Sequence, residues 1–275
     1  MRIVDAQVHI WGANSPERPW PSWGPGNEHL PQPFTQEKLL AAADAAGVDR
    51  VVIVPPSWEG DYNDLALAAA AAHPARFAVM GRFTIDPANG ARLSTWRAQT
   101  GMLGLRFVYR PEMTWLYDDS AEWLWQACER HVLPVMMFAP GHLAALDRLA
   151  ERHPGLNLVL DHMELRREKD AAAFVDLPDL IRIARLPNVA VKASALPCYT
   201  DDVYPYRSIH DYIRQVFDAF GPRRTFWGTD LTRLPCSYRE AISFFTDELT
   251  FLSAEDKEWV MGRAVCEWLG WSLPT

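Results

Sequence analysis

The sequence predicts a single (β/α)8 barrel, the TIM-barrel fold, extending over residues 1–275 as one domain. Eight short apolar segments of strand length alternate along the chain with segments of helical pattern. A length of 275 residues is large for an ordinary domain but normal for one such barrel. A loop rich in tryptophan and proline after the first strand and an extra C-terminal helix are the expected additions to this fold.

The strand segments are short, rich in apolar and β-branched residues, and bounded by turn residues. They are expected at residues 3–11, 50–54, 77–83, 102–108, 133–138, 156–161, 188–193 and 224–229. Helices are expected at residues 35–46, 61–72, 87–98, 120–131, 142–153, 177–185 and 206–220, followed by two more around 238–249 and 254–269. Thr35 and Gly47 are residue types that cap the two ends of a helix, which supports the bounds of the first one.

Composition and charge argue against several kinds of partner. The net charge is −8 at pH 7 and no basic cluster occurs, so a nucleic acid is not expected to bind. No apolar run reaches 18 residues and no charged-then-apolar leader is seen, so we expect a soluble cytoplasmic protein without membrane contact. The four cysteines are widely spaced, which is typical of reduced structural thiols. The sequence leaves the oligomeric state open.

Residues 12–34 contain six prolines, with Trp20 and Trp23 between them. Prolines this dense exclude a regular helix or a sheet ladder. Long loops inside compact domains are usually functional, so we expect this segment to fold over the mouth of the barrel as an aromatic lid. Packing against neighbouring helices is an equally good interpretation for either tryptophan taken alone.

The first strand alternates strictly between two sets of side chains. The apolar set is Val4, Ala6, Val8 and Ile10, and the other set is Asp5, Gln7, His9 and Trp11. Side chains in a strand have a period of two, and helices cover the outer face of a parallel barrel. The second set is therefore expected to point into the lumen, with Gln7 and His9 reaching the mouth.

The fourth strand is expected to place an arginine in the lumen. Gly104 and Arg106 share one face, whereas the bulky Leu103, Leu105 and Phe107 share the face that suits the helices. A buried guanidinium needs an anionic partner. A bidentate grip on a substrate carboxylate and an internal salt bridge to an aspartate are both consistent with this position.

Four more residues are candidates for binding the substrate. Lys192 lies in an apolar strand, where it either binds a carboxylate or bridges lumen acids structurally. Tyr109 follows the strand of the lumen arginine and is a candidate hydroxyl donor. Trp11 ends the first strand and Trp58 follows the second, and both are expected to line the site.

The ends of the sixth and eighth strands supply candidate catalytic residues. His162 shares its parity with Leu160 and Glu164, which places it at the mouth. Closing a barrel makes the eighth and first strands neighbours, so Asp230 is expected beside His9. A carboxylate there can take a proton from water while His9 and His162 polarise a carbonyl.

Five short motifs follow one another along the expected strands. They are Asp5-x-x-x-His9-x-Trp11, Gly104-x-Arg106, Leu160-Asp161-His162, Val191-Lys192-x-Ser194 and Trp227-Gly228-Thr229-Asp230. In this order they resemble the amidohydrolase superfamily, and within it the amidohydrolase-2 branch with 2-pyrone-4,6-dicarboxylate lactonase and sugar-acid lactonases. The resemblance implies hydrolysis by a water that Asp230 activates. It also implies that His9 and His162 contact a metal or the substrate carbonyl, and that Arg106 holds a carboxylate.

The first strand departs from this family at one position, because relatives usually carry His-x-His where this chain has Gln7-Val8-His9. A glutamine oxygen is a poor zinc ligand. Since this branch also includes lactonases that work without a metal, we expect that no cofactor is required. If a divalent metal such as zinc does bind, the expected ligands are His9, His162 and Asp230, with Glu164 as a replacement ligand.

These features predict a hydrolase that opens a lactone, or a related cyclic ester or amide, on a small carboxylated substrate. In this hypothesis Asp230 is the general base, His9 and His162 stabilise the oxyanion, and Arg106 orients the carboxylate, with Gln7 as a secondary binding group. Two alternatives stay open. One is a metal-dependent decarboxylase of an aromatic acid, whose flat ring would suit the lid. The other is an inactive barrel that only binds a carboxylate.

Overall fold

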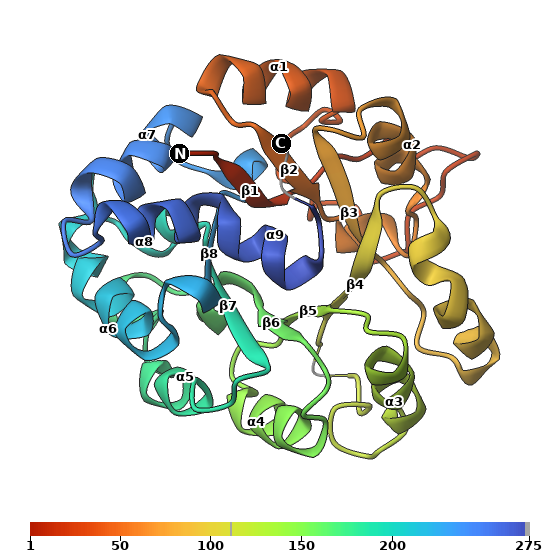
Figure 1. Ribbon diagram of the computed structural model, residues 1–275. Helices are drawn as coiled ribbons and strands as arrows, with labels where there is room; N and C mark the ends of the chain where they lie inside the picture. Colours follow the sequence, from red (N-terminus) through yellow and green to blue (C-terminus); the bar gives the residue numbers. More distant parts are fainter. Residues whose placement is uncertain (111, 273–275) are drawn as a thin grey trace.

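The computed structural model describes residues 1–110 and 112–272, and eight parallel strands form its central sheet in the order β1 to β8 (Figure 1). The strands are Val4–Val8 (β1), Arg50–Ile53 (β2), Phe77–Gly81 (β3), Met102–Val108 (β4), Val135–Phe138 (β5), Leu158–Leu160 (β6), Val189–Ser194 (β7) and Thr225–Gly228 (β8). Helices lie around the outside of the sheet, between consecutive strands. The predicted (β/α)8 barrel is confirmed.

The α-helices agree in order with the expected ones. They are Gln36–Ala46 (α1), Asp64–Ala72 (α2), Glu122–Arg130 (α3), Leu143–Arg152 (α4), Leu177–Ile183 (α5), His210–Phe220 (α6), Tyr238–Ser243 (α7), Ala254–Glu258 (α8) and Ala264–Leu269 (α9). The segment Pro87–Ala98 is a 3-10 helix instead of the expected α-helix. The last expected helix consists of α8, a π-helical turn at Trp259–Arg263, and α9.

The caps predicted for the first helix are present. The Thr35 side chain accepts a hydrogen bond from the backbone N–H of Lys38 at the start of α1. Gly47 ends α1 with φ 81°, a left-handed conformation that glycine adopts without strain. Both assignments made from the sequence are therefore confirmed.

β8 closes the barrel against β1. The backbone N–H of Asp230 donates to the carbonyl oxygen of Gln7 at 2.8 Å, and the N–H of Thr229 donates to Asp5 Oδ1 at 2.9 Å. The prediction that the eighth and first strands are neighbours is confirmed. This closure brings Asp230 to the side of His9.

A β-bulge in β1 changes the face on which its first side chains lie. Between Asp5 and Val8, β1 has one residue more than β2. Asp5 accepts a hydrogen bond from the hydroxyl of Tyr238 in α7, so it faces the helices. Val4 and Ala6 pack instead with side chains of the lumen. The strict alternation predicted for the first strand is therefore wrong on the N-terminal side of the bulge.

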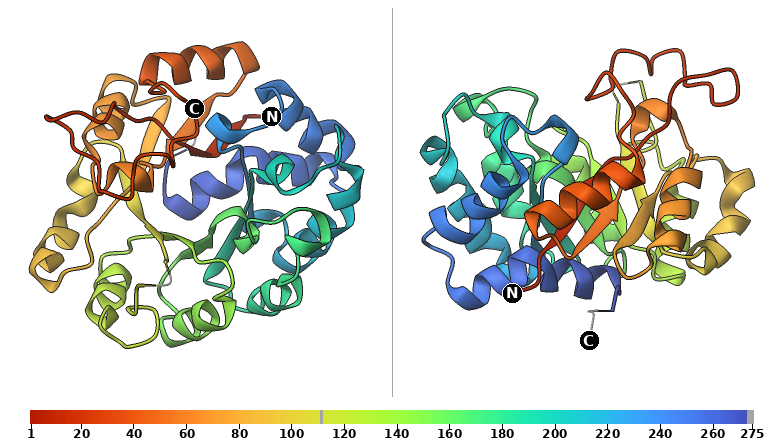
Figure 2. Two further views of the ribbon diagram at one scale, coloured as in Figure 1. Left: turned by 180° about the vertical axis from the view of Figure 1, so that it is seen from behind. Right: turned by 90° about the horizontal axis from the view of Figure 1, so that it is seen from above.

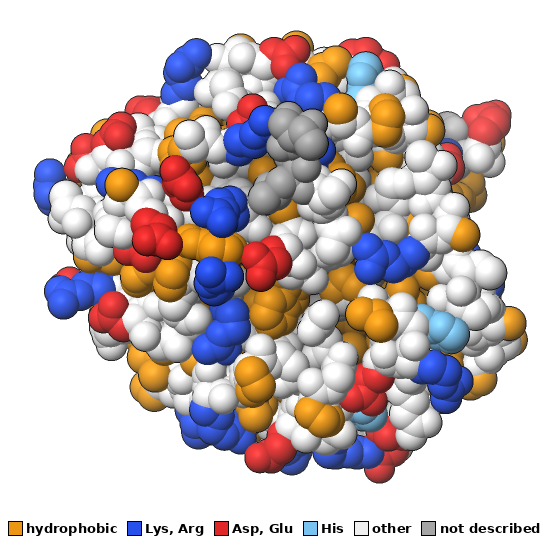
Figure 3. Space-filling model, viewed as in Figure 1, with side chains coloured by type: hydrophobic (Ala, Val, Ile, Leu, Met, Phe, Trp, Pro, Cys, Tyr) orange, Lys and Arg blue, Asp and Glu red, His pale blue; other side chains and the backbone are white. Residues whose placement is uncertain are grey.

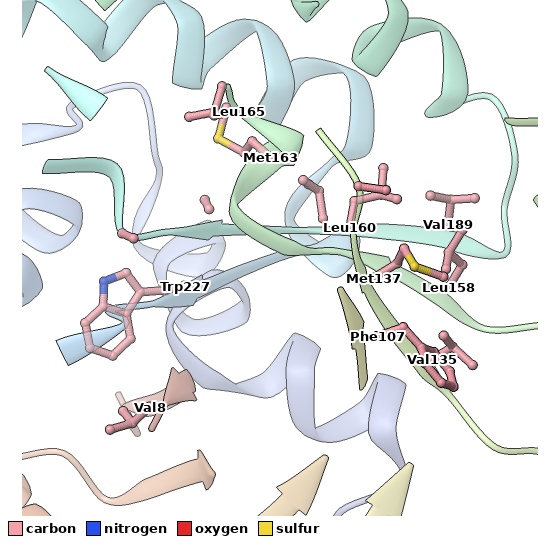
Figure 4. Close-up of a cluster of buried hydrophobic side chains, with 14 of the residues drawn as sticks. Val8, Phe107, Val135, Met137, Leu158, Leu160, Met163, Leu165, Val189 and Trp227 are labelled. Carbon is pink, nitrogen blue, oxygen red and sulfur yellow. The ribbon is translucent and has the colours of Figure 1, made fainter. Parts of the chain in front are cut away.

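Two hydrophobic clusters hold the barrel. The larger lies between sheet and helices, and Figure 4 shows part of it, with Phe107 and Leu158 among its residues. The smaller joins alternate strand residues, such as Met136 and Phe226, to side chains of α9, which crosses one end of the barrel (Figure 1). Leu103 belongs to the smaller cluster and not to the helix side, because the register shifts where β4 pairs with β3.

The loop of residues 12–34 extends over the end of the barrel opposite to both chain termini (Figure 2). A salt bridge of 2.8 Å between Arg18 Nε and Glu59 Oε1 ties it to the chain after β2. A Cβ at Gly24 would lie 2.3 Å from the carbonyl oxygen of Trp58, so only glycine permits this close approach. The predicted lid is confirmed in position.

The two ends of the barrel differ in what covers them. On the face in Figure 3, viewed like Figure 1 with α9 toward the reader, acidic and basic side chains are interspersed. None of the helices within the described part of the chain is long and apolar enough to cross a membrane. The lid lies over part of the other end of the barrel (Figure 2).

Candidate active site

A cavity of about 780 Å³ opens beneath the lid. Its walls come from the ends of the strands, the lid and the loops that follow β4, β6 and β8. The C-terminal ends of parallel strands are where barrel enzymes carry their active sites. The cavity is therefore the candidate active site.

Asp230 lies at the centre of this site. It follows β8 in a left-handed conformation with φ 53°, and it is 1% exposed. Its Oδ1 lies 3.3 Å from His9 Nε2 and 4.0 Å from His29 Nδ1, and its Oδ2 lies 3.9 Å from His162 Nε2 and 3.5 Å from Arg233. Burial alone would raise the pKa of Asp230, but these four neighbours hold it well below its usual range. Asp230 is therefore ionised at neutral pH.

His9 is a neutral imidazole with a defined tautomer. Burial lowers its pKa to about 4, despite the opposing charge of Asp230. Its Nδ1 lies 2.5 Å from the carbonyl oxygen of Val54, which can only accept, so Nδ1 carries the hydrogen. In the neutral ring Nε2 is then an acceptor, and it faces the side-chain amide nitrogen of Gln7 at 3.5 Å as well as Asp230.

His162 is placed by an unusual backbone rather than by strand parity. β6 ends at Leu160, and His162, Met163 and Glu164 have φ of 54°, 55° and 54°. Three successive left-handed residues turn the chain away from the strand direction. His162 Nδ1 consequently lies 2.8 Å from Ser194 Oγ, and burial lowers the pKa of the ring to about 3.

Glu164 does not share the position of His162, and the parity predicted for it is wrong because of this turn. Its Oε2 accepts a hydrogen bond of 2.7 Å from the backbone N–H of Ala139. Burial raises the pKa of its carboxyl group well above the ordinary value. The raised pKa favours the protonated form of Glu164, whose carboxyl group is tied to the backbone.

The two basic residues of the lumen share one carboxylate. Arg106 Nε lies 3.1 Å from Asp161 Oδ2, and Lys192 Nζ lies 2.7 Å from Asp161 Oδ1. Lys192 also donates to Gln7 Oε1 at 2.5 Å. Burial would raise the pKa of Asp161, but the two cations hold it below its ordinary value. Lys192 is thus a structural bridge, whereas Arg106 forms the internal salt bridge and also lines the cavity.

The structure brings together six of the predicted site residues. The cavity is lined by His9, Trp58, Arg106, Tyr109, His162 and Asp230. The other four lie behind it: Gln7, Trp11, Glu164 and Lys192 are not among the lining residues in the described chain. Trp11 packs edge-on against Trp58 with ring centres 5.5 Å apart, so it supports the wall and does not form its surface.

Several lining residues were not predicted from the sequence. His29 belongs to the lid, and Arg110, Arg167, Lys169 and Arg233 belong to loops after strands. The one sequence feature that could have indicated His29 was the predicted lid over the mouth. It places this histidine above the site but does not determine the direction of its side chain. Loop basic residues carry no periodic pattern that distinguishes them from surface charges.

The proposed metal ligands do not form a metal centre in this structure. Glu164 is bound to a backbone N–H, and the oxygen of Gln7 is held by Lys192. Within residues 1–110 and 112–272, no group of three or more His, Cys, Asp or Glu side chains is arranged to hold a metal ion. The prediction that no cofactor is required stays a prediction.

Residues 4–264 match the family model described as amidohydrolase (amidohydrolase 2). The chain belongs to the amidohydrolase family. The match covers all eight strands and the loops that carry the site.

Two curated relatives of this amidohydrolase are lactone hydrolases. It is 28% identical to an L-fucono-1,5-lactonase of Burkholderia ambifaria over 239 residues, which cover 82% of this chain and 79% of the relative. It is 25% identical to a 4-sulfomuconolactone hydrolase of Hydrogenophaga intermedia over 234 residues, with 82% and 73% of the two chains covered. Among solved structures, an amidohydrolase of Burkholderia multivorans with bound zinc has a TM-score of 0.82 at 23% identity, covering 100% of both chains.

These matches confirm the predicted family and the prediction of a hydrolase. At the level of the family they support lactone hydrolysis. The two relatives are named for different lactones, L-fucono-1,5-lactone and 4-sulfomuconolactone.

Proposed function

We propose that this amidohydrolase opens the lactone ring of a small carboxylated substrate by direct attack of water. The observation that carries the proposal is the pairing of Asp230 Oδ1 with His9 Nε2 at 3.3 Å in the cavity. No hydrogen-bond donor reaches this Oδ1 within the described residues. A buried carboxylate oxygen that accepts no hydrogen bond is unfavourable in free energy. A water or the substrate that donates a hydrogen bond to Oδ1 would remove this penalty.

The attacking water would be held by these two acceptors. Asp230 presents an ionised oxygen, and the neutral ring of His9 presents the lone pair of Nε2. A water that donates to both directs its own lone pair at a carbonyl carbon in the cavity. Asp230 takes the proton as the new C–O bond forms. In this proposal His9 orients the water, because its single hydrogen is held by Val54.

His162 would donate to the oxyanion. The hydroxyl of Ser194 can donate to its Nδ1 at 2.8 Å, which leaves the hydrogen of the neutral ring on Nε2. A donor aimed at the developing negative charge stabilises the transition state more than the ground state. His162 is thus the residue to which we assign the oxyanion contact.

The charge of the cavity favours an anionic substrate. Among the residues that the structure describes, five basic residues line it, against two acidic ones, Glu168 and Asp230. Arg106 uses Nε for Asp161, so its terminal nitrogens can form a bidentate pair with a substrate carboxylate. Arg167 and Lys169 add positive charge at the rim, which favours a second acidic group over a neutral sugar ring.

The variant Asp230→Asn tests the general base. We expect kcat for a carboxylated lactone to fall by about 10³-fold or more, because the amide cannot take a proton from water. Asp218→Asn, at an exposed position on α6, is the matched control and should retain full activity. Far-UV circular dichroism checks that both variants fold. Near-normal turnover by a folded Asp230→Asn enzyme would exclude this role.

A substrate panel and metal removal test the remaining assignments. We expect higher kcat/KM for 2-pyrone-4,6-dicarboxylate and 4-sulfomuconolactone than for L-fucono-1,5-lactone, because only the first two carry anionic groups.

Activity should survive dialysis against a chelator, with metal content measured by elemental analysis. Loss of activity on chelation with recovery on adding zinc would contradict the metal-free reaction.

A further inference from the structure

We propose that His29, a residue of the lid, is a further catalytic residue, which delivers to the ring oxygen of the lactone the proton that Asp230 takes from water. The inference deepens the proposed function and rests on it. It assigns to the lid a chemical role in addition to covering the cavity.

His29 occupies a defined position above Asp230. Its Nδ1 lies 2.9 Å from Thr232 Oγ1 and 4.0 Å from Asp230 Oδ1. Its ring centre lies 4.6 Å from that of Trp58 and 5.5 Å from that of His9. The side chain is 18% exposed and lines the cavity. It is thus packed on three sides and open to a bound substrate.

The other two imidazoles are less suited to this task. His9 has its hydrogen committed to Val54, and the Nε2 of His162 faces Oδ2, on the other side of the carboxylate. His29 and His9 both lie near Oδ1 of Asp230, and this is the oxygen proposed to take the proton from water. A neutral imidazole can accept a proton at one ring nitrogen and donate from the other. The separation of 4.0 Å is compatible with this role, since catalytic hydrogen bonds often tighten only when the substrate is bound.

The balance of atoms is complete with water as the only co-substrate. Water forms a bond to the acyl carbon, and one of its protons goes to Asp230. When the tetrahedral intermediate collapses, the bond between the acyl carbon and the ring oxygen breaks. His29 gives the proton of Nε2 to that oxygen and accepts at Nδ1 the proton that Asp230 took from water. Proton exchange with solvent then restores the starting tautomer of His29. The product is a hydroxy acid, which loses its carboxyl proton to solvent.

The structure explains how a lid residue can be held for this task. Arg18 in the lid makes a salt bridge to Glu59, and Gly24 lies against the backbone of Trp58. Thr232, which follows Asp230 by two residues, contacts the imidazole of His29 directly. The lid and the catalytic loop are therefore connected through His29.

The test compares two leaving groups in His29→Ala and His29→Gln. The ring oxygen of a carboxylated saturated lactone leaves as an alkoxide, which requires a proton, whereas that of 2-pyrone-4,6-dicarboxylate leaves as an enolate, which requires it less. We expect kcat of both variants to fall by about 100-fold or more on the saturated lactone and by less than about tenfold on the pyrone. Added imidazole should restore part of the activity of His29→Ala on the saturated lactone. His131→Gln, at the C-terminus of α3, is the control and should behave like the wild type.

Different outcomes separate this inference from the proposed function. Equal losses on the two substrates would overturn the inference, and so would full recovery in His29→Gln, whose amide can still bind Thr232. Either result would leave the lactonase proposal intact. If the wild-type enzyme hydrolyses neither lactone, the proposed function itself fails.

Discussion

Lys192 shows how one buried residue can determine the pairing of charges in the lumen of the barrel. It is fully buried, and its ammonium group is matched by one carboxylate, Asp161, and one amide oxygen of Gln7. The side chain of Gln7 therefore has a structural partner in Lys192. A charged trio of Lys192, Asp161 and Arg106 is tolerated in the interior because each charge has a partner.

Lys192→Met should lower the free energy of unfolding by about 3–5 kcal/mol, because it breaks a buried ion pair by removing one partner. Urea unfolding followed by tryptophan fluorescence measures the change. Lys38→Met, at an exposed position on α1, is the control and should change the value by less than about 0.5 kcal/mol. A Lys192→Met protein as stable as the wild type would rule out an ionised pair at this place.

At the scale of elements, the contact between β1 and the end of β8 determines the site. The bulge in β1 turns Asp5 toward Tyr238 and Thr229, and its carboxylate accepts hydrogen bonds from both hydroxyls. Its other oxygen accepts from the backbone N–H groups of Thr229 and Gln7. These four bonds fix the backbone immediately before Asp230.

Asp5 also predicts a pH dependence of stability. Burial raises its pKa from 3.8 to about 6, so the fold favours the protonated form. Its contribution to stability is complete below about pH 4 and is lost as the pH rises through about 6. In Asp5→Asn this titration is absent. The free energy of unfolding of the wild type minus that of Asp5→Asn should therefore fall by about 2.4 kcal/mol between pH 4 and pH 7.

Urea unfolding of both proteins at several pH values between 4 and 7 measures this difference. Asp218→Asn, the same substitution at an exposed position on α6, provides the comparison for the change from carboxylate to amide. A difference that stays constant or grows with pH for Asp5→Asn would show that the Asp5 carboxyl group is not destabilised by burial.

At the scale of the whole molecule, charge is distributed unevenly. The chain carries a net charge of −8, yet five of the seven charged residues that line the cavity are basic. A positive mouth on an acidic protein attracts small anions locally while the overall field repels them. For a substrate close to the cavity, the attraction by the basic residues of the mouth should exceed the repulsion by the net negative charge, since screening limits the range of the distant charges.

The rate with an anionic lactone should therefore depend on salt. We expect kcat/KM for 2-pyrone-4,6-dicarboxylate to fall several-fold between about 10 mM and about 300 mM salt, as screening weakens the attraction of the mouth. A neutral lactone, assayed in parallel, should show no such trend. Replacing Arg167 and Lys169 together by glutamine should flatten the dependence. A salt dependence that is the same for charged and neutral lactones would contradict a role for these residues.

The sequence by itself determined the barrel and the proximity of His9 and Asp230. Alternation of strand and helix patterns specifies the fold, and closure of any such barrel makes the last strand a neighbour of the first, which is why Asp230 could be placed beside His9 in advance. Only the tertiary structure decided which side chains reach the cavity. A bulge in β1 and three left-handed residues after β6 break the period of two on which Asp5 and Glu164 had been assigned, and such local backbone changes leave no periodic trace. The position of His29 depends on how a proline-rich lid folds back over the mouth, which is set by contacts between residues far apart in the chain.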